Sequence, residues 1–273
     1  MLSSLHFERM RQLALKLAGI ELLDRHRELL SYRVQRLSDR GGDQLEVLLK
    51  AAEEGDSAAG RRLVGLLTTR FTGFFRHPRH FALAVEHALA EAGRKGSVCL
   101  WSAAAATGEE PYSLAMVLIE AFCREDPPVT VLATDISEES LEAAEEGEYG
   151  ERAMSAVSSA RRERFFTRKA TGRWSVSQAV RRLVEFRPLN LAGEHWAITG
   201  LFDVIFCRNV LMYLEPRQRT AALEHLASHL DRDGLLIMDP TEYANVVRLS
   251  LAPGPGGVYS RTDATFPGRA PNT

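Results

Sequence analysis

The chain has 273 residues, 45% of them hydrophobic, so it can bury a sizeable core, and its length suggests two domains. Its 34 Lys and Arg residues nearly balance 36 Asp and Glu residues, and the net charge of −2 gives no reason to expect nucleic-acid binding. The 3 cysteines form no C-x-x-C pair, and neither a signal peptide nor an apolar run of about 18 residues is present, so we expect a soluble, cytoplasmic protein.

Residues 5–67 show helical periodicity interrupted by glycines, which predicts three or four short helices in an N-terminal domain over residues 1–67. The second of these helices is predicted over residues 21–40. Its apolar side chains share one stripe, and its arginines share a different face. These arginines are Arg25, Arg33, Arg36 and Arg40. A basic helix face is most often only solvated, but it also suits an acidic protein partner.

Residues 68–80 are predicted to link the two domains and to contribute to the functional site. The segment 68–78 combines hydroxyls, three phenylalanines and Arg76 just before a proline. The phenylalanines can simply join the two domains. A guanidinium at a domain seam, however, can hold a carboxylate in bidentate fashion, so Arg76 is a candidate site residue.

The rest of the chain is organised around residues 98–119. An apolar run predicts a buried strand, and an alanine-rich turn with Gly108 then leads into a helix, which is where α/β proteins hold nucleotide-like cofactors. A pyrophosphate at this helix N-terminus would meet the carboxylates of Glu109 and Glu110. A phosphate-free adenosyl ligand with a sulfonium would not. The turn therefore favours S-adenosylmethionine (SAM), unless its acidic residues only complement the helix dipole.

Polar residues follow the later predicted strands. Residues 129–135 end in Asp135, which is placed to accept hydrogen bonds from ribose hydroxyls. Asn190 follows a strand at residues 183–187, where an amide can bond an adenine edge. Residues 202–207 predict a strand followed by Arg208 and Asn209, at the end where open α/β sheets bind ligands.

Other patterns complete the predicted framework. Residues 165–168 and 174–176 predict an antiparallel hairpin, and a helix is predicted from Pro216 to about residue 230. Short strands are predicted at residues 235–238 and 258–260, before a tail rich in proline and glycine.

Four motifs carry a resemblance to a known family. They are TTRFTGFFR at 68–76, WSAAAATGEEPYSLAM at 101–116, ATDI at 133–136 and FDVIFCRNVLMYL at 202–214. From about residue 10 to residue 260, the chain resembles the chemotaxis-receptor glutamate methyltransferases, the CheR-type family. The resemblance implies an α/β fold in which an all-helical domain precedes a Rossmann-like SAM-dependent methyltransferase domain. The latter is expected over residues 81–262, with a small antiparallel β-subdomain at about 148–187 and a flexible tail at 263–273.

The resemblance also implies a site and a function. The implied SAM contacts are Thr72, Arg76, Glu110, Asp135, Asn190, Leu191, Arg208 and Asn209. Arg76 and Tyr213 would border the methyl-transfer site, with S-adenosylhomocysteine as the product and no metal. The implied reaction esterifies glutamates of a methyl-accepting chemoreceptor for adaptation in chemotaxis-type signalling. The arginine face would dock on the cytoplasmic helices of the receptor, and we expect a monomer that does not insert into the membrane.

The chain departs from the family pattern at two places. Arg70 stands where an asparagine is usual, and residues 238–242 replace a G-H-S-E-like turn. These departures leave open a catalytically weak or inactive SAM-binding regulatory module, and the acceptor could also be a small carboxylic acid. The alanine-rich turn and the paired Glu109 and Glu110 argue against a nucleotide-dependent oxidoreductase. The short loop between residues 166 and 184 favours receptor recognition that does not depend on a C-terminal pentapeptide.

Overall fold

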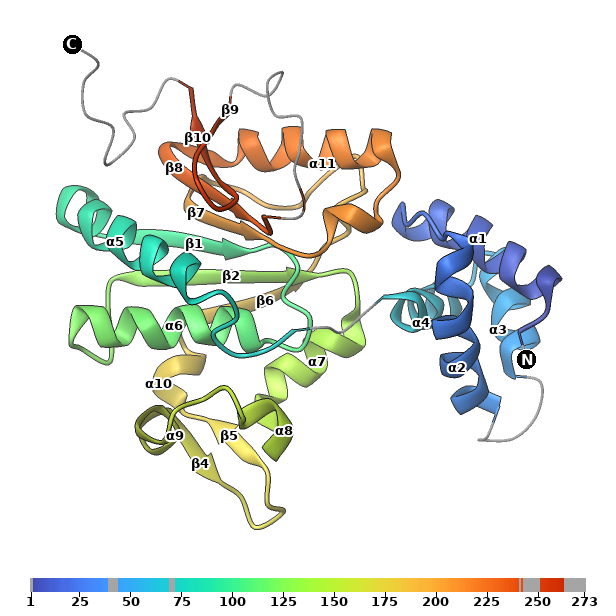
Figure 1. The fold of residues 1–273 in the computed structure, drawn as a ribbon, viewed down its shortest axis with the longest axis horizontal. Helices are drawn as coiled ribbons and strands as arrows, with labels where there is room; N and C mark the ends of the chain where they lie inside the picture. Colours follow the sequence, from blue (N-terminus) through green and yellow to red (C-terminus); the bar gives the residue numbers. More distant parts are fainter. Residues whose placement is uncertain (1, 39–43, 69–71, 241, 243–250, 263–273) are drawn as a thin grey trace.

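The computed structural model describes residues 2–38, 44–68, 72–240, 242 and 251–262. A group of N-terminal helices lies to one side of a larger body that contains the main sheet (Figure 1). The N-terminal helices are α1 (Ser4–Ala18), the 3-10 helix η1 (Asp24–His26), α2 (Arg27–Ser38), α3 (Gln44–Glu53) and α4 (Ser57–Leu67). None of the described helices is both long and apolar enough to cross a membrane.

The larger body combines helices with two sheets. Its helices are α5 (Pro78–Lys95), α6 (Glu109–Phe122), α7 (Glu138–Glu146), α8 (Glu151–Met154), α9 (Ser159–Phe165), α10 (Gln178–Arg181), the 3-10 helix η2 (Leu211–Tyr213) and α11 (Pro216–Ser228). Its strands are β1 (Val98–Ser102), β2 (Val129–Asp135), β3 (Glu148–Tyr149), β4 (Phe166–Arg168), β5 (Trp174–Val176), β6 (Val184–Pro188), β7 (Phe202–Cys207), β8 (Leu230–Met238), β9 (Leu251–Pro253) and β10 (Val258–Arg261).

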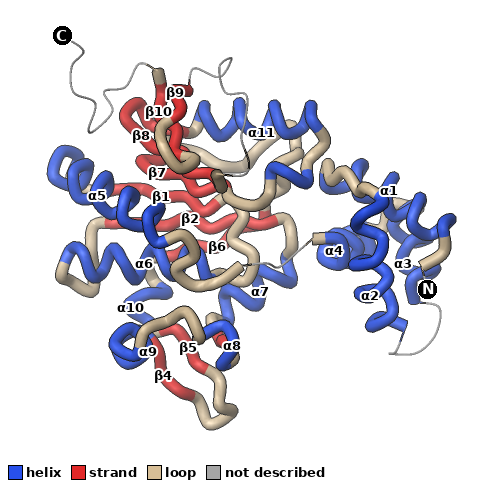
Figure 2. The backbone as a smooth tube through the Cα atoms, viewed as in Figure 1, coloured by secondary structure: helices blue, strands red, loops and turns tan. Residues whose placement is uncertain are grey.

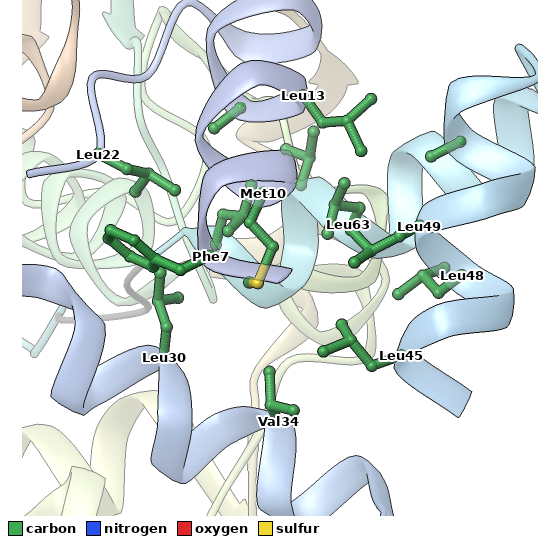
Figure 3. Close-up of a cluster of buried hydrophobic side chains, with 14 of the residues drawn as sticks. Phe7, Met10, Leu13, Leu22, Leu30, Val34, Leu45, Leu48, Leu49 and Leu63 are labelled. Carbon is green, nitrogen blue, oxygen red and sulfur yellow. The ribbon is translucent and has the colours of Figure 1, made fainter. Parts of the chain in front are cut away.

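The N-terminal helices enclose a hydrophobic core of their own. Phe7, Met10 and Leu13 recur at helical spacing on α1, and they pack in one cluster with Leu49 of α3 and Leu63 of α4 (Figure 3). All five side chains are at most 4% exposed. The amphipathic pattern of these short helices is therefore satisfied within the N-terminal group.

Seven of the described strands form one sheet in the order β6-β2-β1-β7-β8-β10-β9. The first five are parallel, and β10 and β9 complete one edge in antiparallel pairing. The chain runs outward from β1 through β2 to β6 and then returns to β7 on the other side of β1 (Figure 1). The strand order thus reverses between β1 and β7, and open α/β sheets bind ligands outside the carboxyl ends of the strands at such a point.

Both faces of the main sheet are covered by helices, which explains the unbroken apolar runs in its central strands. Figure 2 shows the helices around the strands of the main sheet. In β7, Val204 and Phe206 belong to the buried cluster with α5 and α6, whereas Ile205 and Cys207 belong to the cluster with α11. Every residue of β7 is buried. This packing fixes the position of β7, and therefore of Arg208 and Asn209, which directly follow it in the chain.

A second sheet has the order β3-β5-β4. The predicted hairpin is confirmed, since β4 and β5 pair in antiparallel register with Phe166 opposite Val176. The strand predicted at 258–260 is also confirmed as β10, whereas β3 and β9 were not predicted because two or three residues carry too little periodicity. The expected tail, residues 263–273, lies outside the described residues.

Candidate functional site

A cavity of about 360 Å³ lies at the carboxyl ends of β1, β2, β6 and β7, where the strand order reverses. Every residue implied as a cofactor contact lines it, and Tyr213 lines it too. These residues are Thr72, Arg76, Glu110, Asp135, Asn190, Leu191, Arg208 and Asn209. Their contact with a cofactor stays a prediction. The fold nevertheless brings side chains from distant parts of the chain to one cavity, as a shared site requires.

A buried ion pair forms the part of the cavity nearest to β1. Nη1 of Arg208 donates to the Glu110 carboxylate at 2.9 Å, and the hydroxyl of Ser102 donates to the other Glu110 oxygen at 2.8 Å. The Arg208 side chain is only 3% exposed, and its Nη2 donates to the carbonyl of Arg76 at 3.0 Å. Arg208 therefore neutralises Glu110 and also holds the segment that carries Arg76.

Glu109 is directed into the protein and does not share the cavity with Glu110. It is 7% exposed, its carboxylate accepts a hydrogen bond from the Thr107 hydroxyl at 2.7 Å, and burial raises its pKa. Consecutive residues of a helix differ by about 100° in direction, so two neighbouring carboxylates cannot both face one ligand. The prediction that Glu109 would meet a bound pyrophosphate is therefore wrong, and the carboxylates that line the described cavity are Asp135 and Glu110, the latter paired with Arg208.

Asp135 holds the backbone around the cavity as well as lining it. Its carboxylate accepts hydrogen bonds from the backbone N–H of Ala106 at 2.8 Å and of Ser137 at 2.9 Å. These bonds tie the turn after β1 to the end of β2. A carboxylate offers about four acceptor positions, and these two bonds use two of them, so a contact between Asp135 and ribose hydroxyls stays a prediction.

Asn190 is bonded within the protein at both ends of its amide. Its Nδ2 donates to the carbonyl of Leu17 at 3.0 Å, and its Oδ1 accepts from the backbone N–H of Ala192 at 3.0 Å. The side chain thus connects the loop after β6 to the end of α1. This connection was not predicted, and a contact between Asn190 and adenine stays a prediction.

Glu242 organises the loop between β7 and η2, a role that the sequence analysis missed. Its carboxylate is 7% exposed and accepts hydrogen bonds from the backbone N–H of Asn209 at 2.6 Å and of Met212 at 3.2 Å. Asn209 has a φ of +57°, a conformation that asparagine tolerates, and its Nδ2 donates to Asp239 at 2.9 Å. Asp239 and Glu242, two described residues of the unusual segment 238–242, therefore support the loop at the cavity. Arg70, the other departure, lies outside the described residues.

We expect Glu242→Ala to weaken SAM binding, because it leaves two backbone donors of the cavity loop without their acceptor. The cost of about 1–3 kcal/mol per buried unpaired group implies at least a several-fold increase in the dissociation constant, measured by calorimetry. Glu224→Ala, an exposed carboxylate on α11, is the matched control. Equal SAM affinity in the two variants would contradict the role assigned to Glu242.

Backbone hydrogen bonds hold the N-terminal helices against the side of the cavity opposite the cofactor residues. Glu21 N–H donates to the carbonyl of Tyr213 at 2.8 Å, and Glu215 N–H donates to the carbonyl of Gly19 at 2.9 Å. Gly19 has a φ of +64°, and a Cβ there would lie 2.4 Å from Cβ of Ala192. Glycine is therefore needed both for the conformation and for the close contact.

Because of this contact, the N-terminal helices form one wall of the cavity, which the sequence analysis did not predict. The wall is formed by residues from the end of α1, the following segment, η1 and the start of α2, and includes Ile20, Leu22, Arg25, His26 and Leu29. The sequence signal for this wall was the short apolar segment after Gly19, where the helical pattern is interrupted. This signal did not indicate which other part of the chain the segment contacts.

Of the predicted arginine face, the structure describes the side chains of Arg25 and Arg33, and these two lie in different surroundings. The helix expected over residues 21–40 begins at Arg27, and Arg25 lies in η1, exposed and at the cavity. Nη1 of Arg33 instead donates to carbonyls at the end of α4, among them Leu66 and Thr68, each at 2.8 Å. The C-terminus of a helix carries a partial negative charge and unpaired carbonyls, which attract a cation. This attraction explains why the Arg33 side chain turns toward the end of α4.

The remaining two arginines of that prediction cannot be placed in the same way. Arg36 lies on α2, but its side chain is outside the described part of the structure, and Arg40 lies outside the described residues altogether. Among the described residues, no group of His, Cys, Asp and Glu is arranged to hold a metal.

The residues of the cavity fit a SAM molecule. Apolar side chains such as Ile136, Leu189 and Leu191 suit adenine, and the Asp135 carboxylate suits ribose hydroxyls. The buried Nε–H of Arg208 has no hydrogen-bond partner in the described part of the chain, and such a donor suits the carboxylate at the methionine end. Gly108 has a φ of +92°, but a Cβ there would meet Ala144 at 2.9 Å, so this glycine serves packing between helices.

Fold and site together define a Rossmann-like SAM-dependent methyltransferase. Residues 70–247 match the family model described as "CheR methyltransferase, SAM binding domain". The chain is 35% identical over 241 residues to chemotaxis protein methyltransferase 2 of Pseudomonas aeruginosa, covering 86% of this chain and 85% of that protein. It is 37% identical over 253 residues to the chemotaxis protein methyltransferase of Salmonella typhimurium, with 90% and 87% covered.

A solved structure of magnesium protoporphyrin IX methyltransferase from Synechocystis with bound SAM is 18% identical, covers 85% of this chain and 88% of that chain, and has a TM-score of 0.37. The family match and the relatives establish that the chain belongs to the CheR methyltransferase family. Its cofactor is SAM, as the turn after β1 predicted.

Proposed function

We propose that the protein transfers the methyl group of SAM to side-chain carboxylates of glutamates in a chemoreceptor, forming glutamyl methyl esters. The observation that carries this proposal is the shared cavity. One wall of the cavity belongs to the SAM-binding domain and includes Arg76 and Tyr213. The opposite wall belongs to the N-terminal helices. Relatives of similar length bear the name chemotaxis protein methyltransferase, which supports a receptor as the acceptor.

The residues of the site suit esterification of a carboxylate. A glutamate side chain has an unperturbed pKa near ~4.3, so it is already ionised at neutral pH and needs no general base. Bound SAM supplies an activated methyl group on a sulfonium. Arg76 orients the acceptor carboxylate and the Tyr213 hydroxyl donates a hydrogen bond to it, so that positioning contributes roughly 7–11 kcal/mol to lowering the barrier.

The acceptor is proposed to reach the site in the cytoplasm, as part of the receptor's helical methylation region. Arg25 is exposed beside the cavity and offers a cation to an acidic receptor surface. The proposed enzyme acts as a monomer and recognises the receptor without its C-terminal pentapeptide. The non-enzymatic alternative rested partly on residues 238–242, and the bonds that Glu242 makes remove that reason for it.

Reversing one charge beside the cavity is expected to slow receptor methylation and to spare SAM binding. Arg25→Glu replaces attraction to an acidic receptor by repulsion, which should lower kcat/KM for a receptor fragment roughly fivefold at low salt. The loss should shrink as ionic strength rises. Arg62→Glu makes the same charge change at an exposed position of α4 and serves as the control. Equal rates for both variants would refute docking at Arg25.

Transfer of a radiolabelled methyl group tests the proposed function itself. The purified chain is incubated with methyl-labelled SAM and a cytoplasmic receptor fragment, and the label is then treated with base. Base-labile label on the fragment, released as methanol, is the expected result, because methyl esters hydrolyse in base. Binding of SAM without transfer would instead favour the regulatory module.

A further inference from the structure

His26 is held beside Tyr213, although it belongs to the N-terminal helices. The segment before it is fixed by the bond from Glu21 N–H to the carbonyl of Tyr213 and by the backbone bridge between Ile20 and Leu214. The rings of His26 and Tyr213 have centroids 6.4 Å apart, and both line the cavity. The position of the imidazole is thus tied to the wall that carries the proposed methyl-transfer site.

The hydrogen bonds of His26 assign its tautomer. The backbone N–H of Leu23 donates to Nδ1 at 3.1 Å, while Nε of Arg25 lies 3.4 Å from Nε2. A neutral imidazole has only one acceptor nitrogen, so both contacts cannot be hydrogen bonds to it. A backbone N–H always donates, and its contact is shorter, whereas Arg25 is exposed and has other directions available. Nδ1 is therefore the acceptor, and Nε2 carries the proton.

The neutral form of His26 is favoured by its surroundings. Burial lowers the pKa of the imidazole first, and the charge of Arg25 lowers it further. Protonation would also place an Nδ1–H against the N–H of Leu23. The neutral imidazole still offers one N–H, at Nε2, as a hydrogen-bond donor.

We propose that Nε2–H of His26 donates a hydrogen bond to the carboxylate that accepts the methyl group, and that His26 thereby positions the protein substrate. This role rests on the proposed function and adds a third donor to Arg76 and Tyr213. His26 comes from the wall opposite the cofactor residues, so its contribution falls on the acceptor and leaves the affinity for SAM unchanged.

Two substitutions separate this role from the structural bond to Leu23. In His26→Asn, the amide oxygen replaces the Nδ1 acceptor, but nothing reaches the position of Nε2–H. In His26→Gln, an amide N–H reaches the position of Nε2, but the Nδ1 acceptor is lost. A donor role therefore predicts that the Gln variant is the more active of the two, and a purely structural role predicts the reverse order.

The measurement is steady-state methylation of a receptor fragment, together with calorimetric titration of SAM. We expect His26→Asn to raise the KM for the fragment, or lower kcat/KM, about tenfold. His26→Gln should recover most of the lost kcat/KM. The affinity for SAM should stay within about twofold of the wild-type value in both variants. Wild-type activity in the Asn variant, or a Gln variant less active than the Asn variant, overturns the inference alone. Absence of transfer by the wild-type protein overturns the proposed function and this role with it.

Discussion

Arg208→Met is expected to destabilise the protein by about 3–5 kcal/mol, because it leaves the Glu110 carboxylate buried without its counter-charge. The Glu110 side chain is 12% exposed and that of Arg208 is 3% exposed, so water cannot replace the lost partner easily. The variant also frees the carbonyl of Arg76. Urea unfolding should show the loss directly, and the thermal midpoint should fall by roughly 6–20 °C.

Two further variants test the cause of this loss. Arg208→Met combined with Glu110→Gln removes the unpaired charge and keeps an acceptor for the Ser102 hydroxyl, so it should recover part of the stability. Arg217→Met, at an exposed position of α11, should change stability by less than about 0.5 kcal/mol. If Arg208→Met unfolds no more easily than Arg217→Met, the buried pair does not stabilise the site.

Asp135→Ala is expected to lower the affinity for SAM and for S-adenosylhomocysteine by a factor of about 10–150. Hydrogen bonds to a charged group are worth about 1.5–3 kcal/mol, and this carboxylate is proposed to bind the ribose. It also holds the backbone of Ala106 and Ser137, so its loss loosens the turn that faces the ligand. Calorimetric titration of both compounds gives the change.

Asp135→Asn distinguishes the charge from the shape of this side chain. The amide oxygen keeps one acceptor for the backbone, but the negative charge and one acceptor are lost. We expect an intermediate affinity, together with thermal unfolding close to that of the wild-type protein. An alanine variant that binds SAM as tightly as the wild-type protein is incompatible with ribose binding at Asp135.

The main strands and their terminal polar residues could be predicted because the central strands are largely buried and read as apolar runs, whereas the edge strand β6 was found from the shorter pattern at residues 183–187. β1, β2, β6 and β7 were located in this way, and every candidate cofactor residue lines one cavity. Glu110 was correctly placed at the cavity, whereas Glu109 was not. Sequence spacing identifies acidic residues in the first turn of a helix, but the direction of each one depends on how the helix rotates against the sheet.

The features that the sequence analysis missed depend on contacts between residues that are distant in the sequence. Arg33 lies on a helix whose periodicity indicated a solvated basic face, yet its guanidinium binds the end of α4, which is distant in sequence. The wall containing His26 depends in the same way on backbone bonds between residues near 20 and near 214. Such pairings leave no periodic pattern in either segment.

A crystal structure of the protein with S-adenosylhomocysteine tests the central claim most directly, namely that the cavity at the carboxyl ends of β1 and β7 holds the methyl donor against the N-terminal helices. The account predicts ribose hydroxyls on Asp135, the amino-acid end near Glu110 and Arg208, and the sulfur between Arg76 and Tyr213. Density for the ligand outside this cavity, or a ribose remote from Asp135, would contradict it.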